Sequence, residues 1–366
     1  MNMKCEVVYS YFYDIADRIN LEAVKGYIEG AEVFPFYEYG KAVPEGISPF
    51  ELPIILDVGK KEIKIDDADI NLKIQCVIYS VGAIAIRIRL PIDEVDLPYI
   101  ERTAFDKKFE DTFRNVSEST KSEIEKTLSK YIKVKEKETF ETYRVYFIDD
   151  DASKFVPENK NWIAGILLDE QNYSELSNDY VENTIKRRLT YYKNDTIIID
   201  WDAALIVSKA GNYENEMMII DTSNVQLLEY RVYQEEIDKM IDSINAKTAR
   251  IQRSLWNVLG NRRSMIKLST EISDFYTEYK DMIDSVNKIV MSFGEWYLAR
   301  VYSLLSDSFK LKDIESRLES TFEMLVRIRD FIKEQVSEDT SSFLELVVIL
   351  LFVVEIAIII IPLMKL

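Results

Sequence analysis

The sequence has 366 residues, enough for about two domains, and a formal net charge of −18 from 64 acidic and 46 basic residues. It contains no histidine, which excludes Ser-His-Asp and Cys-His catalysis, histidine-ligated metals and histidine pH switches. The acidic balance argues against sequence-specific DNA binding, because phosphate contacts need clustered lysine and arginine. Two cysteines, Cys5 and Cys76, cannot form a four-cysteine metal site, and we expect both to be buried as small hydrophobic side chains.

The first half of the chain alternates between strand and helix patterns, which predicts an α+β fold with an α/β N-terminal half. We expect residues 1–135 to form an α/β domain that ends in a charged helical connector, and residues 136–211 to form a second α/β unit. The two could equally be one unit. Apolar alternation predicts strands over 4–15, 50–59, 70–80, 83–92 and 143–149, and a strand pair over 196–209.

Two charged features of this half have a functional and a structural interpretation. Arg87 and Arg89 alternate on one face of a strand, which indicates either a half-solvated antiparallel strand or an anion contact. The acidic run Asp149–Asp151 and the pair Asp200 and Asp202 could form an oxygen-only Mg²⁺ or Ca²⁺ site, or could accept hydrogen bonds in turns. The sequence has neither of the glycine loops that bind nucleotide phosphates, and we assign no catalytic residue, metal ligand or cofactor.

Residues 212–342 carry apolar side chains at helical spacing, which predicts a helical bundle and coiled-coil stalk. We expect one helix to end at Gly260 and Asn261, a second over Ser264–Met291, a third over Trp296–Ser308, and a last one from about Lys310. An a/d-like repeat on the last helix is the candidate surface for helix association, either inside the chain or between chains. It consists of Leu311, Ile314, Leu318, Leu325, Ile328 and Ile332.

One window opposes the overall charge. Between Ser243 and Thr270 there is no acidic residue. This segment is a candidate patch for an anionic partner, which could be lipid headgroups, nucleic-acid phosphate or the acidic surface of the protein itself. The patch consists of Lys247, Arg250, Arg253, Arg262, Arg263 and Lys267.

The segment 343–364 is predicted to be a single transmembrane helix. From Leu346 to Met364 its only ionisable residue is Glu355, and about 20 apolar residues suffice for a helix to cross the hydrocarbon core. Pro362 lies near the end, where the loss of a backbone hydrogen bond matters little. We therefore expect a single-pass, tail-anchored protein with its soluble body on the cytoplasmic side. Glu355 indicates a helix–helix contact, an ion pathway, or a protonated side chain tolerated in lipid.

Two stretches resemble a known family. The first stretch consists of residues 200–214 and the run from Asn224 to Glu229. The second stretch consists of residues 315–335 and the apolar residues 344–361 that follow. Together they resemble the required-for-meiotic-nuclear-division family, also called domain of unknown function 155. This resemblance implies a membrane protein with one C-terminal span, and a link to the translation machinery such as that of the mitochondrial member.

The sequence therefore favours a non-enzymatic membrane scaffold or adaptor that self-associates and tethers a partner. The expected partners are membrane lipid, a second copy of the chain, and the ribosome or another protein. Two alternatives remain at this stage: an oligomeric pore or transport subunit that uses Glu355, and an oxygen-ligated metal enzyme.

Overall fold

The computed structural model describes residues 5–27, 31–33, 52–66, 68–93, 96–135, 139–209, 212–253, 258–292 and 296–334. Residues 311–334 are also helical. The helices and strands in chain order are β1 (Cys5–Asp14), α1 (Leu21–Tyr27), β2 (Ala31–Val33), β3 (Ile54–Ile65), β4 (Ala68–Ile78), β5 (Ala83–Ile92), α2 (Leu97–Phe105), α3 (Lys107–Leu128), β6 (Phe140–Ile148), α4 (Ala152–Glu158), α5 (Lys160–Leu168), the short 3₁₀ helix η3 (Tyr173–Glu175), α6 (Asn178–Lys186), β7 (Arg188–Leu189), β8 (Thr196–Ile199), β9 (Ala203–Val207), α7 (Glu214–Arg253), α8 (Val258–Ser292) and α9 (Trp296–Ser308).

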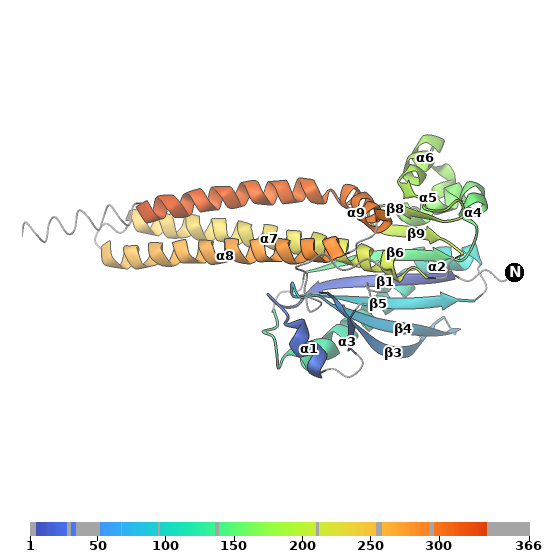
Figure 1. Ribbon diagram of the computed structural model, residues 1–366, viewed down its shortest axis with the longest axis horizontal. Helices are drawn as coiled ribbons and strands as arrows, with labels where there is room; N and C mark the ends of the chain where they lie inside the picture. The colour runs from blue at the N-terminus through green and yellow to red at the C-terminus, as the bar shows by residue number, and fades with distance from the viewer. Residues whose placement is uncertain are drawn as a thin grey trace, which may run out of the picture. The chain divides into compact units, whose positions relative to one another are not determined.

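One mixed sheet organises the first part of the chain (Figure 1). Its nine strands lie in the order β2-β3-β4-β5-β1-β6-β9-β8-β7, and every neighbouring pair is antiparallel except β6 and β9. The N-terminal strand is central, because Cys5 lies opposite Ile92 of β5 and opposite Ile148 of β6. The boundary predicted between 135 and 136 therefore falls inside a single sheet, and the two predicted α/β units are joined through β1.

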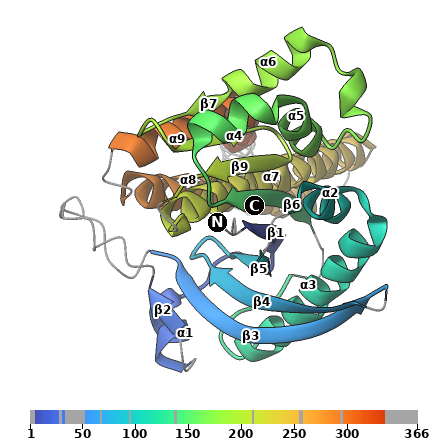
Figure 2. The ribbon, with the colours of Figure 1, turned by 90° about the vertical axis from the view of Figure 1, so that its right-hand side faces the viewer.

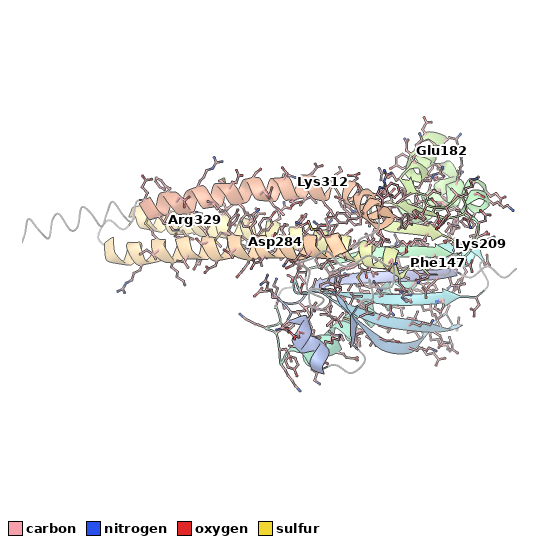
Figure 3. The ribbon with its side chains drawn as sticks, in the orientation of Figure 1. Phe147, Glu182, Lys209, Asp284, Lys312 and Arg329 are labelled. Carbon is pink, nitrogen blue, oxygen red and sulfur yellow. The ribbon has the colours of Figure 1, made fainter. Side chains whose placement is uncertain are left out.

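Helices cover both faces of this sheet, as Figure 2 shows for α3 and α7. Successive residues of β1 point to opposite faces. The Tyr9 ring meets Phe113 of α3 edge-on at 4.8 Å, whereas the hydroxyl of Ser10 lies 3.4 Å from Asp221 of α7. Phe147 of β6 is labelled in Figure 3. On the α7 side of the sheet, its ring stacks on the ring of Tyr213, with centroids 4.3 Å apart. The segment predicted as a charged connector is the amphipathic helix α3, which buries its apolar side chains against the sheet.

Burial of the second face corrects the prediction for β5. All residues from Ala83 to Leu90 are buried, including Arg87 and Arg89, so the strand is not half-solvated. The cause is α7, in which every residue from Met217 to Tyr230 is buried. An alternation of arginine with isoleucine predicts a solvated face only when nothing covers that face.

The structure divides into two compact units, of which the sheet and its helices form the first. Counting only the described residues, this α+β unit comprises those up to Val232 and those from Met282 to Glu315, and the second comprises those from Tyr233 to Asp281 and those from 316 to 334. The division therefore falls inside α7, after Val232, whereas the sequence predicted a boundary at 211. The α+β class, with the sheet first and helices afterwards, is confirmed.

Within the second unit, parts of α7, α8 and the helix over 311–334 pack around aromatic side chains. The ring of Phe322 stacks on Tyr279 at 4.3 Å and lies 5.2 Å from Phe275. Tyr233 packs against Phe275, with centroids 5.7 Å apart. An exposed ion pair of 3.1 Å joins Lys280 to Glu319. We refer to this part of the chain as the helical unit.

The expected helix end at Gly260 is wrong. Helix α7 stops at Arg253, and α8 begins at Val258 and runs through Gly260. A single glycine costs about 1 kcal/mol in a helix, which packing of the surrounding helix can offset. The helix predicted over Trp296–Ser308 has the same bounds as α9.

The predicted transmembrane segment lies outside the described residues, and so do Leu346, Glu355 and Pro362. Among the helices that the structure describes, none is both long and apolar enough to cross a membrane. The span therefore stays a prediction from the sequence.

Candidate functional site

The basic residues singled out in the sequence are distributed over two helices. Lys247, Arg250 and Arg253 belong to α7, and the other three belong to α8. Of the six side chains, the structure describes those of Arg263 and Lys267, and both are exposed. Lys267 lies 3.7 Å from Glu271 one turn along α8. This contact is a weak surface pair, and the role of the patch stays a prediction.

The a/d-like residues of the last helix divide by burial. Leu311, Leu318, Leu325 and Ile332 are buried, whereas Ile314 and Ile328 are half-buried. A second set of apolar side chains on this helix is exposed to solvent, since Met324 is 44% and Phe331 62% exposed.

Asp151 and Asp200, among the acidic candidates, accept hydrogen bonds in turns. Asp151 caps α4, because its Oδ1 accepts a bond of 3.0 Å from the backbone N–H of Ser153. Asp200 accepts a bond of 2.7 Å from the backbone N–H of Trp201 and lies 3.0 Å from Arg187. Within the described ranges, no three acidic or cysteine side chains come together in an arrangement that could hold a metal ion.

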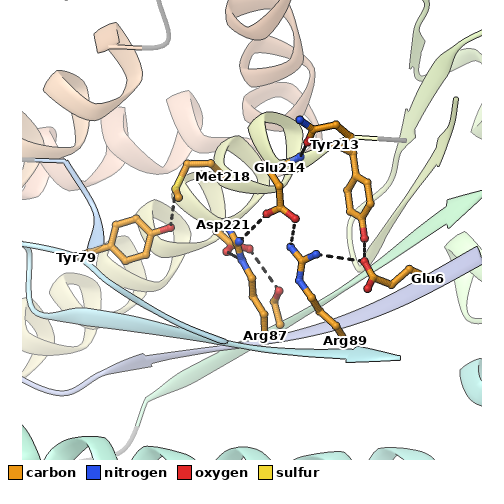
Figure 4. Close-up of polar contacts among 10 residues, drawn as sticks. Glu6, Tyr79, Arg87, Arg89, Tyr213, Glu214, Met218 and Asp221 are labelled. Atoms are coloured by element: carbon orange, nitrogen blue, oxygen red, sulfur yellow. Dashed lines mark hydrogen bonds and ion pairs between the residues drawn. The ribbon is translucent and has the colours of Figure 1, made fainter. Parts of the chain in front are cut away.

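An ion cluster that is buried except at Glu214 joins β5 and β1 to the first turns of α7 (Figure 4). Nε of Arg87 donates to Oδ2 of Asp221 at 2.6 Å, and neither side chain is exposed. The same guanidinium reaches Glu214 at 3.3 Å. Burial raises the pKa of Asp221, and the charge of Arg87 opposes that rise.

Arg89 extends this cluster. It lies 2.5 Å from Glu214 and 3.2 Å from Glu6, which also accepts a hydrogen bond from the hydroxyl of Tyr213. Burial raises the pKa of Glu6, and the nearby Glu214 adds to the rise. Both arginines form ion pairs with acidic side chains of the same unit. This geometry gives no support to the prediction that Arg87 and Arg89 contact a bound anion. The cluster holds α7 on the sheet.

A cavity of about 400 Å³ opens on the other face of the sheet, between β1, β6 and α3. We call it the β1–β6 pocket. Its floor is formed by alternate residues of two paired strands, because Tyr9 of β1 lies opposite Arg144 of β6 and Tyr11 opposite Thr142. The full lining is Tyr9, Tyr11, Ala104, Glu110, Arg114, Phe140, Thr142, Arg144, Asp169 and Asp202.

Arg144 is the most constrained side chain of this pocket. One terminal nitrogen donates to the carbonyl of Ala104 at 3.0 Å, and the other lies 3.2 Å from Asp169. Asp169 ends α5 in the left-handed backbone conformation, with φ of 56°. Nearby hydroxyl and carboxyl groups raise the pKa of Arg144 against the effect of burial, so its charge is permanent.

A second cavity, of about 290 Å³, is lined by Tyr191, Tyr192, Tyr213 and Tyr297 together with smaller polar groups. The rings of Tyr191 and Tyr192 meet at 87° with centroids 4.7 Å apart, and Tyr297 lies 5.1 Å from Tyr191. Burial raises the pKa of Tyr297, and so does the nearby Glu216.

Of the residues that line the β1–β6 pocket, the sequence singled out only Asp202. The available signal was the alternation of tyrosine in residues 9–13 and of threonine, arginine and tyrosine in 142–146, which places polar side chains on one face of two strands. What the sequence could not supply was the pairing of those strands, which are separated by more than a hundred residues.

The comparisons with known proteins agree on one family. Residues 4–214 match the family described as uncharacterized protein MJ0711, N-terminal domain. Uncharacterized protein MJ0711 of Methanocaldococcus jannaschii is 27% identical over 218 residues, which is 59% of this chain. The chain covers 65% of that relative, slightly less than two thirds of its length. No solved structure matches the chain.

These findings correct the resemblance drawn from the sequence. Nothing in them points to the required-for-meiotic-nuclear-division family, and the implied link to the translation machinery has no further basis. The matched region ends at Glu214, the first residue of α7, so it contains the whole sheet and the helices α1 to α6, and it leaves out α7, which covers the second face. The chain belongs to the family of uncharacterized proteins defined by the N-terminal domain of MJ0711.

Proposed function

We propose that this protein is a non-enzymatic, membrane-anchored adaptor that associates with a second copy of itself and presents its α+β unit to a partner. The observation that carries the proposal is an exposed apolar stripe on the helix over 311–334, the last described segment before the apolar run Leu346–Met364. The sequence supplies the anchor, and the stripe supplies the contact between copies.

The stripe consists of Met324, Ile328 and Phe331. Spacing of four and then three residues places all three on one side of a helix. It differs from the face that carries Leu318, Phe322 and Leu325, which are buried within the chain. The helix therefore has one apolar face committed to the fold and a second one open to solvent.

A second copy is the occupant that fits this stripe best. Chains anchored in one membrane by the same C-terminal segment share an orientation, so equivalent stripes face each other at the same height. Burying a methionine or phenylalanine side chain stabilises by about 1.5–3 kcal/mol, which is enough to support association when anchoring raises the effective concentration.

The test measures the mass of the detergent-purified full-length chain by light scattering coupled to size exclusion. We expect an oligomer for the native chain and a monomer for the double variant Met324→Glu with Phe331→Glu. Ile266→Glu is the matched control, since Ile266 is 46% exposed on α8 of the same unit and outside the stripe. A monomeric native chain, or an oligomer that the double variant leaves intact, refutes self-association through the stripe.

A pore or transport subunit is the second candidate, favoured by the single ionisable residue, Glu355, inside the apolar run. In that case Glu355→Gln changes ion conductance across a bilayer. In an adaptor the same variant leaves conductance at the level of protein-free membrane and affects assembly alone.

A further inference from the structure

The β1–β6 pocket is lined by a hydroxyl group that the fold itself does not use. Tyr11 is 3% exposed and lines the cavity. Among the described residues, no hydrogen bond involves its hydroxyl. Its neighbour on the same strand face, Tyr9, donates its hydroxyl proton to the carbonyl of Thr103. The side chain of Tyr11 is enclosed, but its hydroxyl oxygen is not among the buried unpaired atoms of the described residues, so the hydroxyl is accessible to a molecule in the cavity.

The charges of the pocket leave carboxylates in excess. The two terminal nitrogens of Arg144 are satisfied by Asp169 and by a backbone carbonyl. The guanidinium of Arg114 lies over the ring of Phe140 at 4.7 Å, and its Nε is 3.5 Å from Glu118, one turn along α3. Both arginines therefore have partners of opposite charge.

Glu110 and Asp202 have no such partner. Neither carboxylate forms an ion pair with any residue that the structure describes. Burial raises the pKa of Asp202; Arg144 and, more weakly, Arg231 oppose the rise, and the nearby Asp169 and Asp200 add to it. A positive charge placed beside Asp202 would reduce this repulsion.

We infer that the β1–β6 pocket binds the primary ammonium group of a small amine. An ammonium has three donors and no acceptor, which matches the carboxylates of Glu110 and Asp202 together with a hydroxyl oxygen of Tyr11 or Thr142. The ring of Phe140 offers apolar surface to a short alkyl chain. A cavity of about 400 Å³ accommodates a ligand of this size.

The test uses three ligands of one shape and different charge: butylammonium, butanol and butyrate. Each is titrated into the full-length chain in detergent at neutral pH and followed by saturation-transfer NMR. We expect butylammonium to bind in the millimolar range, as its few heavy atoms allow, and the other two to bind at least about tenfold more weakly. Absence of butylammonium binding, or equal binding of butyrate, overturns the inference.

Three variants locate the site. Asp202→Asn removes the charge and is expected to weaken butylammonium binding about tenfold, and Tyr11→Phe removes only the hydroxyl and is expected to weaken it about threefold to tenfold. Asp179→Asn removes one negative charge from the exposed start of α6 and is expected to leave binding unchanged. Each variant is first shown to keep the native thermal transition. Equal losses in all three would mean general attraction to an acidic protein and would refute the site.

Discussion

Replacing Arg87 by methionine removes a buried charge but keeps a side chain of similar length. Arg87 and Asp221 are both completely buried, and their 2.6 Å contact joins β5 to α7 out of reach of solvent. Without Arg87, the Asp221 carboxylate keeps the hydroxyl of Ser10, at 3.4 Å, as a hydrogen-bond donor. Breaking a buried pair by removing one partner costs about 3–5 kcal/mol, against a typical total stability of about 5–15 kcal/mol.

The assay is urea unfolding of the full-length chain in detergent, followed by tryptophan fluorescence, for Arg87→Met, Asp221→Leu and the double variant. The double variant is expected to lose at least about 2 kcal/mol less than the sum of the single losses, because neither charge is then left alone. Arg231→Met is the control, since its partner Glu141 forms a half-exposed pair worth at most about 1 kcal/mol. A loss below about 1 kcal/mol for Arg87→Met, or simple additivity, refutes the reasoning.

The same variant has a predicted pH dependence. The pKa of Asp221 is raised in the folded protein, and removal of Arg87 takes away the charge that opposes the rise. A carboxyl whose folded pKa exceeds its unfolded pKa binds more protons in the folded state, so stability falls as pH rises through the folded pKa. Arg87→Met is therefore expected to recover stability as the pH is lowered from 7 toward 5. A deficit that stays constant over this range would contradict the assignment to Asp221.

Three further predictions concern single side chains of the α+β unit, each read from the thermal unfolding transition or from thiol labelling. Tyr9→Phe is expected to lower stability by about 1 kcal/mol, whereas Tyr11→Phe stays within about 0.5 kcal/mol, because only the first loses a hydrogen bond. Equal losses of stability in the two variants would contradict the conclusion that the hydroxyl of Tyr11 forms no hydrogen bond within the described residues. Cys5 and Cys76 are free and buried, with pKa values raised by burial to about 12, so neither reacts with a thiol reagent at pH 8 until the protein is unfolded. Gly82→Ala is expected to cost more than about 2 kcal/mol, because a Cβ there would fall 1.8 Å from the carbonyl oxygen of Ala16 at a φ of +102°, and a native-like transition would refute this.

Elements with a strong local pattern were predictable from the sequence. The strand pattern over 83–92 has the bounds of β5, and the helix predicted over Trp296–Ser308 has those of α9. In both cases the apolar period along a short stretch of chain decides the structure. The burial of both cysteines follows in the same way from the apolar strands that carry them.

Relations between distant segments were not predictable. Nothing in residues 5–14 indicates that this strand pairs with residues 140–148, yet that pair joins the two halves of the sheet and forms the floor of the pocket. The pocket also needs Arg114 from α3 and Asp169 from the end of α5, which no spacing along the chain brings together. The burial of Arg87 likewise depends on α7, whose position is set by contacts across more than a hundred residues.

The buried segment of α7 explains why the family resemblance failed. The run from Asn224 to Glu229 is polar at several positions and looks distinctive as a sequence, but all of it is buried within the chain. Its polar groups are largely satisfied close by: the side-chain amide of Asn224 donates to the carbonyl one turn earlier at 2.9 Å, and that of Gln226 donates to the hydroxyl of Tyr230 at 2.8 Å. Polar side chains in a helix that is buried on all sides need hydrogen-bond partners, since unpaired groups there are costly. Such a run therefore indicates that the helix is buried, and it says little about the family to which the chain belongs.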